Sequence, residues 1–453
     1  MLGVVGVLAL VCGAFTGAAG ADAPTQDGPT AAGYATAWLA DQLDGQIPMQ
    51  NFGSPDWGVT LDAALGMVAA GSGGDQIDAV WASLEADLES AVAPGGVDAP
   101  GRLARVILLA TVTGRDPRAI GAAPGADLVA RLEATRQTGG ADLGLFGSQS
   151  PTYDGAFRQG YALAALVAAG AVPEQSSIDW LLAQQCGPEA DGGAWMPYRA
   201  DLSVPCAVDP AMFVGPDTNA TSAAITGLTA VGAGDEAVEA ALGWLDSVQE
   251  TDGGWGQMVG YGTEPNSTAL VLQSLIAVDA QDDPRFADRA ATPLQALLSF
   301  QLGCDVPEAD RGAFTYPGSN DAPNGFATAQ AVGAAAGAPV LFEPGDLSDG
   351  VTPLDCTPVT TSTTTTVAPT TAAPTTAAPT TAAPTTAAPT TAAPTTAAPE
   401  VAGATQSSSA STTGTATGLA LTGTPAGTLA AAGSIAILAG LVLLVGARRR
   451  SAA

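Results

Sequence analysis

A recurring pattern of one glutamine and one aromatic residue constrains this chain more than any other feature. In its fullest form it consists of Trp244-Leu245, Gln249, Gly253-Gly254 and Trp255. Three other segments carry a glutamine, a glycine-containing turn and an aromatic residue: Gln137 with Phe146, Gln185 with Trp195, and Gln301 with Phe314. The four glutamines are separated by 48, 64 and 52 residues, a spacing in the range of helical repeat architectures. The sequence therefore predicts a repeated helical unit.

Two kinds of helical pattern alternate between about residues 33 and 340. One kind is rich in small residues and apolar nearly all round, and it begins near residues 60, 101, 155, 217, 265 and 324. The other kind is amphipathic and carries tryptophan or leucine, at 35–43, 80–88, 127–136, 177–185, 236–249 and 293–300. Helices that are apolar on all sides belong in the interior, whereas helices with one apolar face belong outside. The sequence therefore predicts an all-α domain with six inner and six outer helices.

These residues carry a family resemblance. The pattern from Trp244 to Trp255 resembles the QW repeat of squalene and terpenoid cyclases, and the alternating helices resemble the α/α-toroid that those cyclases share with protein prenyltransferases. The resemblance covers about residues 33–340, and the first two units keep only Trp38-Leu39 and Trp81. It implies an (α/α)6 toroid of two concentric layers. It does not imply an activity, because the same toroid serves enzymes and binding proteins.

The charge balance excludes several classes of partner and mechanism. The chain has 14 basic residues, all of them arginine, and 44 carboxylates, for a net charge of -30. A field of that sign repels nucleic acid, so we expect no nucleic-acid partner. Without histidine there is no Ser-His-Asp triad, no Cys-His dyad and no histidine-ligated zinc, and without lysine there is no Schiff base. The carboxylates form a solubilising surface or, alternatively, bind divalent cations.

The chemistry of the similar enzymes finds little support in the residues. Class II terpenoid cyclases protonate their substrate through a D-x-D-D motif, and the segment Asp279-Ala280-Gln281-Asp282-Asp283 has a different spacing. Protein prenyltransferases hold zinc with Asp, Cys and His and grip diphosphate with Lys and Arg, whereas here the arginines are scattered along the sequence. We therefore expect no metal and no cofactor. A catalytic role would fall to a cavity carboxylate, Asp217 or Asp62.

Polar residues at the start of the inner helices are the candidates for contact with a ligand in a central cavity. They are Asp217, Asn219, Thr221, Asn266, Thr268 and Asn324. Their alternative role is to cap the helices, for which Asp, Asn and Thr are favoured. The sequence predicts a binding or adhesion module for an unidentified small molecule, which could be a corrin, or for a lipid or protein. The alternative is a divergent exported terpenoid cyclase or prenyltransferase-like enzyme that acts on a prenyl lipid.

Four cysteines outside the N-terminal region predict two disulfides in an exported chain. Cys186 and Cys304 occupy equivalent places just past the glutamine of their units, which argues against a bond between them. The preferred pairs are Cys186–Cys206 and Cys304–Cys356, and the second would fasten the segment 341–357 to the sixth unit. Each closure is expected to contribute about 3–4 kcal/mol.

Both ends of the chain predict export and anchoring. Residues 1–21 read as a signal peptide, and 358–418 as a disordered Thr/Ala/Pro-rich stalk in which Pro-Thr-Thr-Ala-Ala occurs six times. Residues 419–453 join Leu419-Ala420-Leu421-Thr422-Gly423, an apolar run over 428–447 that is long enough to span a membrane, and three arginines.

This order of motifs resembles the LAxTG sorting signal of actinobacterial sortase substrates. The resemblance implies that a sortase joins Thr422 to peptidoglycan. The alternative is a single-pass membrane anchor through 428–447. Either one places the toroid outside the cell, on the wall or the membrane.

Overall fold

The structure, a computed structural model, describes residues 27–356 except 122–124, 150–153, 188–191, 209–213 and 344. The chain divides into two units between Ser362 and Thr363, and all the described residues belong to the first. The predicted signal peptide, the stalk, the sorting signal and the transmembrane helix at 428–447 lie outside the described residues. Within the described part, no helix is long and apolar enough to cross a membrane.

The described residues are mainly helical, which confirms the predicted all-α class. Their thirteen α-helices are α1 (Gly28–Leu43), α2 (Trp57–Ala69), α3 (Gly74–Ala86), α4 (Leu88–Val92), α5 (Pro100–Val112), α6 (Leu128–Ala134), α7 (Ala156–Ala168), α8 (Gln175–Ala183), α9 (Thr218–Val231), α10 (Asp235–Ser247), α11 (Pro265–Ala277), α12 (Pro293–Leu298) and α13 (Gly325–Ala335). Short 3-10 helices occur at Pro94–Gly96, Pro284–Phe286 and Glu308–Asp310. Strands β1 (Gln50–Asn51) and β2 (Ser54–Pro55) form one antiparallel hairpin.

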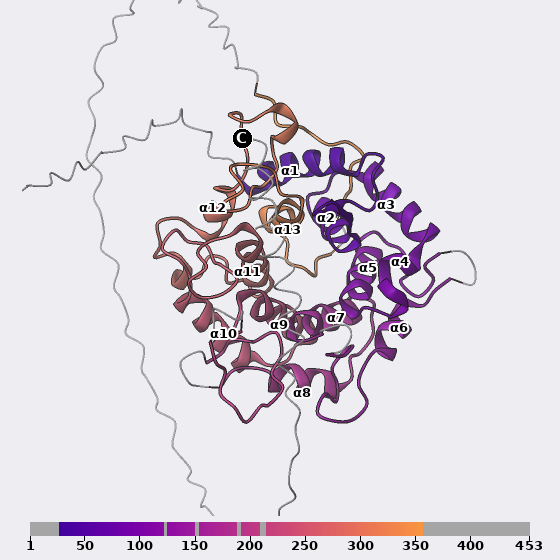
Figure 1. The fold of residues 1–453 in the computed structure, drawn as a ribbon, viewed down its shortest axis with the longest axis vertical. Coiled ribbons are helices and arrows are strands. Elements are labelled where there is room, and N and C mark those ends of the chain that lie inside the picture. Colours follow the sequence, from indigo (N-terminus) through magenta and orange to yellow (C-terminus); the bar gives the residue numbers. More distant parts are fainter. Residues whose placement is uncertain are drawn as a thin grey trace, which may run out of the picture. The chain divides into compact units, whose positions relative to one another are not determined.

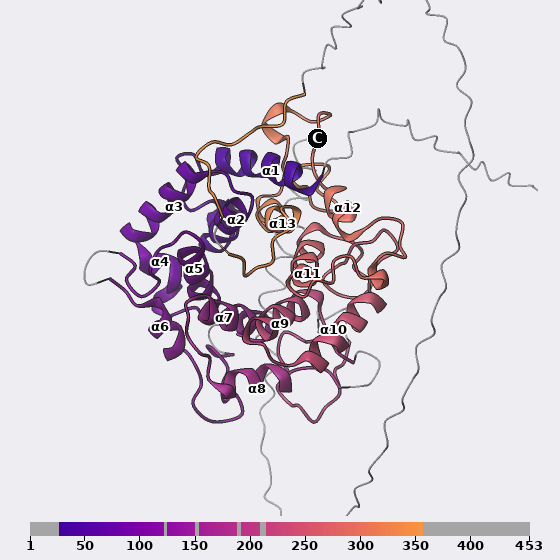
Figure 2. The same ribbon diagram turned by 180° about the vertical axis from the view of Figure 1, so that it is seen from behind.

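The helices α2, α5, α7, α9, α11 and α13, called the inner helices below, form a closed circuit of contacts. Each one packs against the next, and α13 packs against α2 (Figures 1 and 2). These are the six helices with small apolar residues that the sequence predicts for the interior. The remaining helices lie outside this circuit in Figure 1 and are called the outer helices. Six of them match the predicted amphipathic segments, and α4 is an additional short helix after α3.

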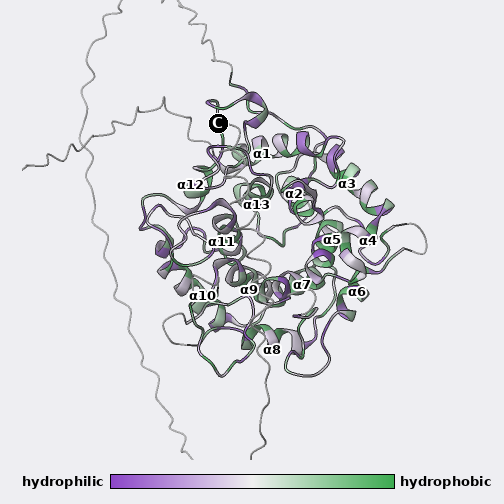
Figure 3. Ribbon diagram, in the orientation of Figure 1, coloured by the Kyte–Doolittle hydropathy of each residue, from purple (hydrophilic) through white to green (hydrophobic). Residues whose placement is uncertain are grey.

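Small residues let the inner helices approach closely. A Cβ atom at Gly227 in α9 would lie 2.6 Å from the Cα of Gly160 in α7, and one at Gly66 in α2 would lie 2.9 Å from the Cβ of Val332 in α13. Hydrophobic residues occur along the helices of both layers (Figure 3), and one hydrophobic cluster takes buried residues from every described α-helix. The low side-chain volume of the inner helices therefore sets the spacing of the circuit.

The repeat glutamines join the turns of the pattern to the helices around them. Each donates a side-chain hydrogen bond to a glycine carbonyl of its own unit: Gln137 to Gly147 (2.6 Å), Gln185 to Gly193 (2.9 Å), Gln249 to Gly253 (2.8 Å) and Gln301 to Gly312 (2.9 Å). Gln185 also donates to the carbonyl of Ala237 in α10 (2.8 Å), the outer helix of the next unit. Gln301 donates in the same way to Ala31 in α1 (2.8 Å), and this bond links the last unit to the first.

Glycines in the same turns meet two requirements at once. Gly193 and Gly312 have φ of +98° and +83°, a left-handed conformation that glycine adopts without steric cost. A side chain at Gly193 would also collide with the carbonyl of Ala240 in α10, and one at Gly312 with the carbonyl of Tyr34 in α1. The turn of each of these two units thus packs on the backbone of the following outer helix, and for the sixth unit that helix is α1.

The backbone N–H of each repeat aromatic residue is held by the fourth residue of an inner helix. The acceptors are Gln159 for Phe146 (2.9 Å), Thr221 for Trp195 (2.9 Å), Thr268 for Trp255 (3.0 Å) and Thr328 for Phe314 (2.9 Å). In the first unit, Thr60 accepts from Met49 in the same way (2.8 Å). The four aromatic side chains are at most 1% exposed, so they belong to the core.

Two disulfides join Cys186 to Cys206 and Cys304 to Cys356, the pairs preferred from the sequence. The second links the loop after α12 to the last described residue. Before that residue, Ser348 exchanges backbone hydrogen bonds with Gly71 (3.1 Å) and Gly74 (2.9 Å) at the turn between α2 and α3. The two disulfides indicate that the domain folds in an oxidising compartment.

Candidate functional site

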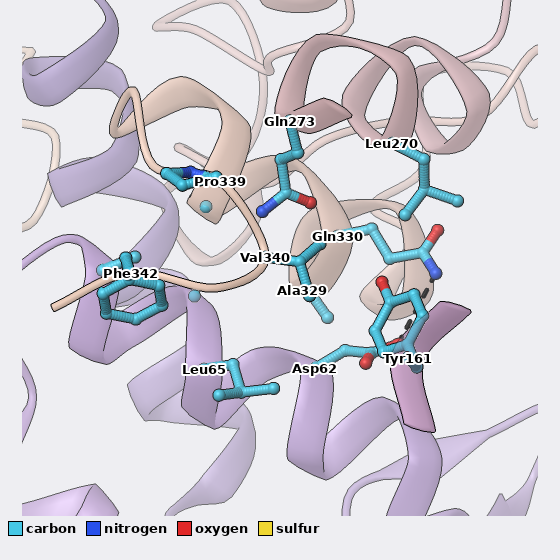
Figure 4. Close-up of a pocket in the computed structure, with 13 residues that line it drawn as sticks. Asp62, Leu65, Tyr161, Leu270, Gln273, Ala329, Gln330, Pro339, Val340 and Phe342 are labelled. Atoms are coloured by element: carbon cyan, nitrogen blue, oxygen red, sulfur yellow. Dashed lines mark hydrogen bonds between the residues drawn. The ribbon is translucent and has the colours of Figure 1, made fainter. Parts of the chain in front are cut away.

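The sixth residues of the inner helices are Asp62, Arg105, Tyr161, Ala223, Leu270 and Gln330. Four of them, Asp62, Arg105, Tyr161 and Gln330, form a polar cluster. Asp62, Tyr161, Leu270 and Gln330 line one small cavity and are drawn around it in Figure 4. Five inner helices thus place a side chain other than alanine at this level, and three of those side chains are amide or charged.

Ion-pair and hydrogen-bond contacts connect this cluster across the circuit. Arg105 forms an ion pair with Asp62, and its guanidinium lies 4.8 Å from the centre of the Tyr161 ring. Gln330 donates to Asp62 at 3.5 Å and accepts at 2.8 Å from the side-chain amide of Asn266 in α11. The contacts therefore run from α11 through α13 and α2 to α5 and α7.

Arg105 stays protonated although it is buried. Burial is the largest influence on the pKa of Arg105 and acts to lower it. The negative charge of Asp62 and its hydrogen bond to Arg105 outweigh burial, so the pKa lies above its usual value. Burial also raises the pKa of Tyr161, which keeps the phenol protonated. The ion pair of Asp62 and Arg105 therefore links α2 to α5, and the two charges balance each other.

Two cavities border the polar cluster. The small cavity, of about 40 Å³, is lined by the later turns of α2, α11 and α13 and by the segment after α13, from which Pro339, Val340 and Phe342 contribute (Figure 4). The large cavity, of about 680 Å³, lies at the N-terminal ends of α7, α9, α11 and α13. Arg105 and Gln330 line this large cavity as well.

Polar side chains at helix starts and aromatic side chains from loops share the lining of the large cavity. The polar group comprises Asp217, Asn219, Gln257, Glu264, Asn266 and Asn324, and the aromatic group comprises Phe52, Phe157, Tyr316 and Phe326. Of the residues proposed from the sequence, Asp217, Asn219, Asn266 and Asn324 therefore meet at one cavity. Thr221 and Thr268 do not line it, because their hydroxyls hold the backbone N–H groups of Trp195 and Trp255.

Asp217 both caps α9 and faces the large cavity. Its side chain accepts a hydrogen bond from the backbone N–H of Ala220 at 2.5 Å, and the residue is 4% exposed. Burial raises its pKa to about 7, although hydrogen bonds from Ala220, Asn219 and Gln257 act in the opposite direction. Asn324 caps α13 through the N–H of Ala327 (2.9 Å). Capping and a place at the cavity are thus compatible.

Asn266 differs from these two residues because it caps no helix. The cap position of α11 is Glu264, and Asn266 is the second residue of the helix. Its amide donates to Gln330, but its carbonyl oxygen Oδ1 is buried and has no hydrogen-bond partner among the described residues. A buried acceptor of this kind costs about 1–3 kcal/mol while it stays unpaired.

None of the four aromatic residues at the cavity was predicted from the sequence, and Tyr316 and Phe52 are the two with distinctive surroundings. Tyr316 donates its hydroxyl to Glu264, and burial raises the pKa of that phenol. Phe52 lies between β1 and β2 with φ of +50° and is 94% exposed. A left-handed conformation is uncommon for a residue other than glycine, and its cost suggests a functional constraint.

Three arginines that are far apart in the sequence also meet. Arg102, Arg105 and Arg158 line a depression of about 450 Å³ beside the start of α5. Each pairs with a carboxylate: Asp56, Asp62 and Asp154, respectively. Arg105 lines both this depression and the large cavity. Among the described residues, no group of three or more Asp, Glu or Cys side chains could hold a metal ion.

No protein-family model and no curated protein matches the sequence. Among solved structures, a protein from Actinoplanes is 16% identical with a TM-score of 0.48, and the match covers 69% of this chain and 99% of that one. Haptocorrin in complex with Cbi is 12% identical with a TM-score of 0.39, covering 70% and 69%. The type II terpene cyclase MstE from Scytonema is 15% identical with a TM-score of 0.44, covering 68% and 96%. Similarities at this level carry no conclusion about activity.

Proposed function

We propose that the chain is a surface-anchored binding protein, built as an (α/α)6 toroid, that holds a small molecule in the large cavity. The closed circuit of inner helices with outer helices around it supports the toroid. One observation carries the function: a cavity of about 680 Å³ into which the N-terminal ends of three inner helices bring amide and carboxyl side chains. Its volume lies within the range of about 300–1,000 Å³ that is usual for small-molecule sites.

The alternative, a divergent terpenoid cyclase or prenyltransferase-like enzyme, has less support. A buried carboxyl beside aromatic residues is the feature that favours it, and Asp217 is that carboxyl. Protonation of an alkene requires a strong acid, whereas burial raises the pKa of Asp217 to about 7 and makes it a weaker one. The other carboxylate proposed as catalytic, Asp62, forms an ion pair with Arg105. Binding without chemistry therefore fits these residues better.

The anchor rests on the sequence alone. The Thr/Ala/Pro-rich stretch over 358–418 supports a stalk, and Leu419 to Gly423 with the apolar run and arginines behind it support attachment by a sortase. We propose that Thr422 carries the link to peptidoglycan. The binding cavity would then be displayed at the cell surface.

The test is mass spectrometry of small molecules that co-purify with the full-length chain. We expect one class of molecule with the natural protein and with a Val172→Trp control, because Val172 is 90% exposed and does not line the large cavity. An Asn219→Trp variant fills part of the cavity, so the molecule should be absent from it. Retention of the same molecule by Asn219→Trp, or its absence from all three proteins, would contradict the proposal.

A further inference from the structure

Among the described lining residues of the large cavity, the arginine is ion-paired and the two carboxyl groups are hydrogen-bonded. Its arginine, Arg105, is paired with Asp62. Glu264 accepts from the hydroxyls of Tyr316 and Ser267, and Asp217 accepts from Ala220, Asn219 and Gln257. No anion is therefore required to balance the arginine, and the neutral donors of Glu264 do not cancel its negative charge. An anion would lose its hydration without gaining an unpaired positive charge.

An entirely apolar ligand is equally poorly matched. Asn219 and Asn324 bring amide groups to the lining from the starts of α9 and α13, and Gln257 brings one from the segment between α10 and α11. An apolar molecule would cover these amide groups without replacing their hydrogen bonds to water, whereas O–H or N–H groups of a ligand would pair with them. The polar wall thus suits a ligand that carries several hydrogen-bonding groups.

Aromatic side chains give the cavity an apolar surface beside its amide groups. Phe52 stands at the end of a two-residue hairpin turn with Gly53, and both residues have positive φ, +50° and +77°. Phenylalanine brings no hydrogen bond that would favour this conformation, yet its ring is almost fully exposed. Phe326 and Tyr316 at the same cavity are 37% and 38% exposed. Exposed rings beside a polar wall offer flat apolar surfaces to a ligand.

We propose that the large cavity binds a neutral saccharide. A pyranose ring has an apolar C–H face and a rim of hydroxyl groups that both donate and accept, so it can lie against Phe52 while its hydroxyls reach Asn219, Gln257 and Asn324. The proposal rests on the proposed function and names its ligand class. It also gives a reason for the exposure of Phe52.

Isothermal titration calorimetry with the full-length chain tests this assignment. The probes are cellotetraose, maltotetraose and chitotetraose as neutral saccharides, choline as a small cation and farnesol as an apolar alcohol. We expect at least one of the saccharides to bind. We expect Phe52→Ala to weaken that binding about tenfold and Asn219→Ala about fivefold, as the loss of one stacking surface and of one hydrogen bond predicts.

A matched control separates recognition from folding. Val172→Ala removes an exposed hydrophobic side chain that does not line the large cavity, and it should leave the saccharide affinity unchanged. Because Phe52 is 94% exposed, Phe52→Ala should unfold at the same urea concentration as the natural protein, so a loss of affinity cannot come from unfolding.

The outcomes distinguish this proposal from the one it rests on. Binding of choline or farnesol without any of the saccharides would overturn the saccharide assignment and leave the binding function standing. Saccharide binding that neither Phe52→Ala nor Asn219→Ala weakens would also overturn it, because the ligand would then lie elsewhere. Binding of none of the five probes would overturn it too. The co-purification experiment decides the binding function separately.

Discussion

The bond between Gln301 and α1 makes a quantitative prediction about ring closure. Gln301 donates to Gly312 in its own unit and to Ala31 in the first helix, while Gln185 donates to Gly193 and to Ala237 in the next unit. Both glutamines are half-buried. Gln249 has one described acceptor for its side-chain amide, Gly253. In a closed ring Gln301 is therefore equivalent to Gln185, although it lies in the last repeat.

The magnitudes follow from the number of hydrogen bonds lost. Each intramolecular hydrogen bond contributes about 1 kcal/mol net to the free energy of unfolding. Gln185→Ala and Gln301→Ala should each lower it by about 2 kcal/mol, and Gln249→Ala by about 1 kcal/mol. In an open array Gln301 would keep only the hydrogen bond to Gly312 in its own turn. Gln301→Ala would then lower the free energy of unfolding by about 1 kcal/mol.

Urea unfolding followed by tryptophan fluorescence measures these differences, since the chain has seven tryptophans. The informative comparison is between variants. Suppose that Gln301→Ala lowers the free energy of unfolding no more than Gln249→Ala does, while Gln185→Ala lowers it twice as much. The inference that the last unit closes on the first would then be wrong. Equal losses for Gln185→Ala and Gln301→Ala support it.

Three further predictions concern single groups. The pKa of Asp217 is raised from 3.8 to about 7 in the folded state, so the folded protein binds the carboxyl proton more tightly than the unfolded chain does. The protonated carboxyl therefore contributes fully to stability below pH 3.8, and this contribution is lost as the pH rises through about 7. Urea unfolding at a series of pH values should show this loss of stability in the natural protein and not in Asp217→Asn. Cys304→Ser removes a disulfide that spans 52 residues, and Cys186→Ser removes one that spans 20. The free energy of unfolding should therefore fall by about 4 kcal/mol in the first variant and by about 3 kcal/mol in the second. A larger loss for Cys186→Ser in urea unfolding would contradict the pairing of these cysteines. Thr422→Ala should move the protein from the wall fraction to the membrane or the medium, as immunoblots of cell fractions would show, and unchanged wall attachment would refute the role of a sortase.

The sequence predicted those parts of the fold that depend on local pattern. The six inner and six outer segments follow from periodicity and side-chain size, and each matches a described helix. The equivalent positions of Cys186 and Cys304 argue against a bond between them, and the disulfide pairs were preferred because each closes the loop or tail after its own helix. Both kinds of feature are properties of one repeat, so they can be read without knowledge of the tertiary structure.

The site was predicted in part, for a physical reason. Helix-start residues such as Asp217, Asn219 and Thr221 have the same sequence signal whether they cap, hold a neighbouring turn or face a cavity. The structure separates them: Asp217 caps and faces the cavity, Asn219 faces it, and Thr221 binds the N–H of Trp195. The side-chain direction that decides this is set by packing between units.

The polar cluster was missed because its members are distant in sequence. Arg105 lies 43 residues from Asp62, and Gln330 lies 268 residues from it. Their common feature, the sixth place of an inner helix, becomes visible only when the first residue of each helix is known, and sequence patterns leave such boundaries uncertain by a few residues. Phe52 gave no signal either, since a phenylalanine before a glycine is ordinary in composition.

Hydrogen–deuterium exchange of the full-length chain, with and without the saccharide that binds best, shows where the ligand binds. We expect slower exchange of backbone amides at the starts of α9, α11 and α13, over 217–220, 264–270 and 324–330, and at the hairpin that carries Phe52. Protection confined to the outer helices, with unchanged exchange at these three helix starts, would contradict the claim that the large cavity is the binding site.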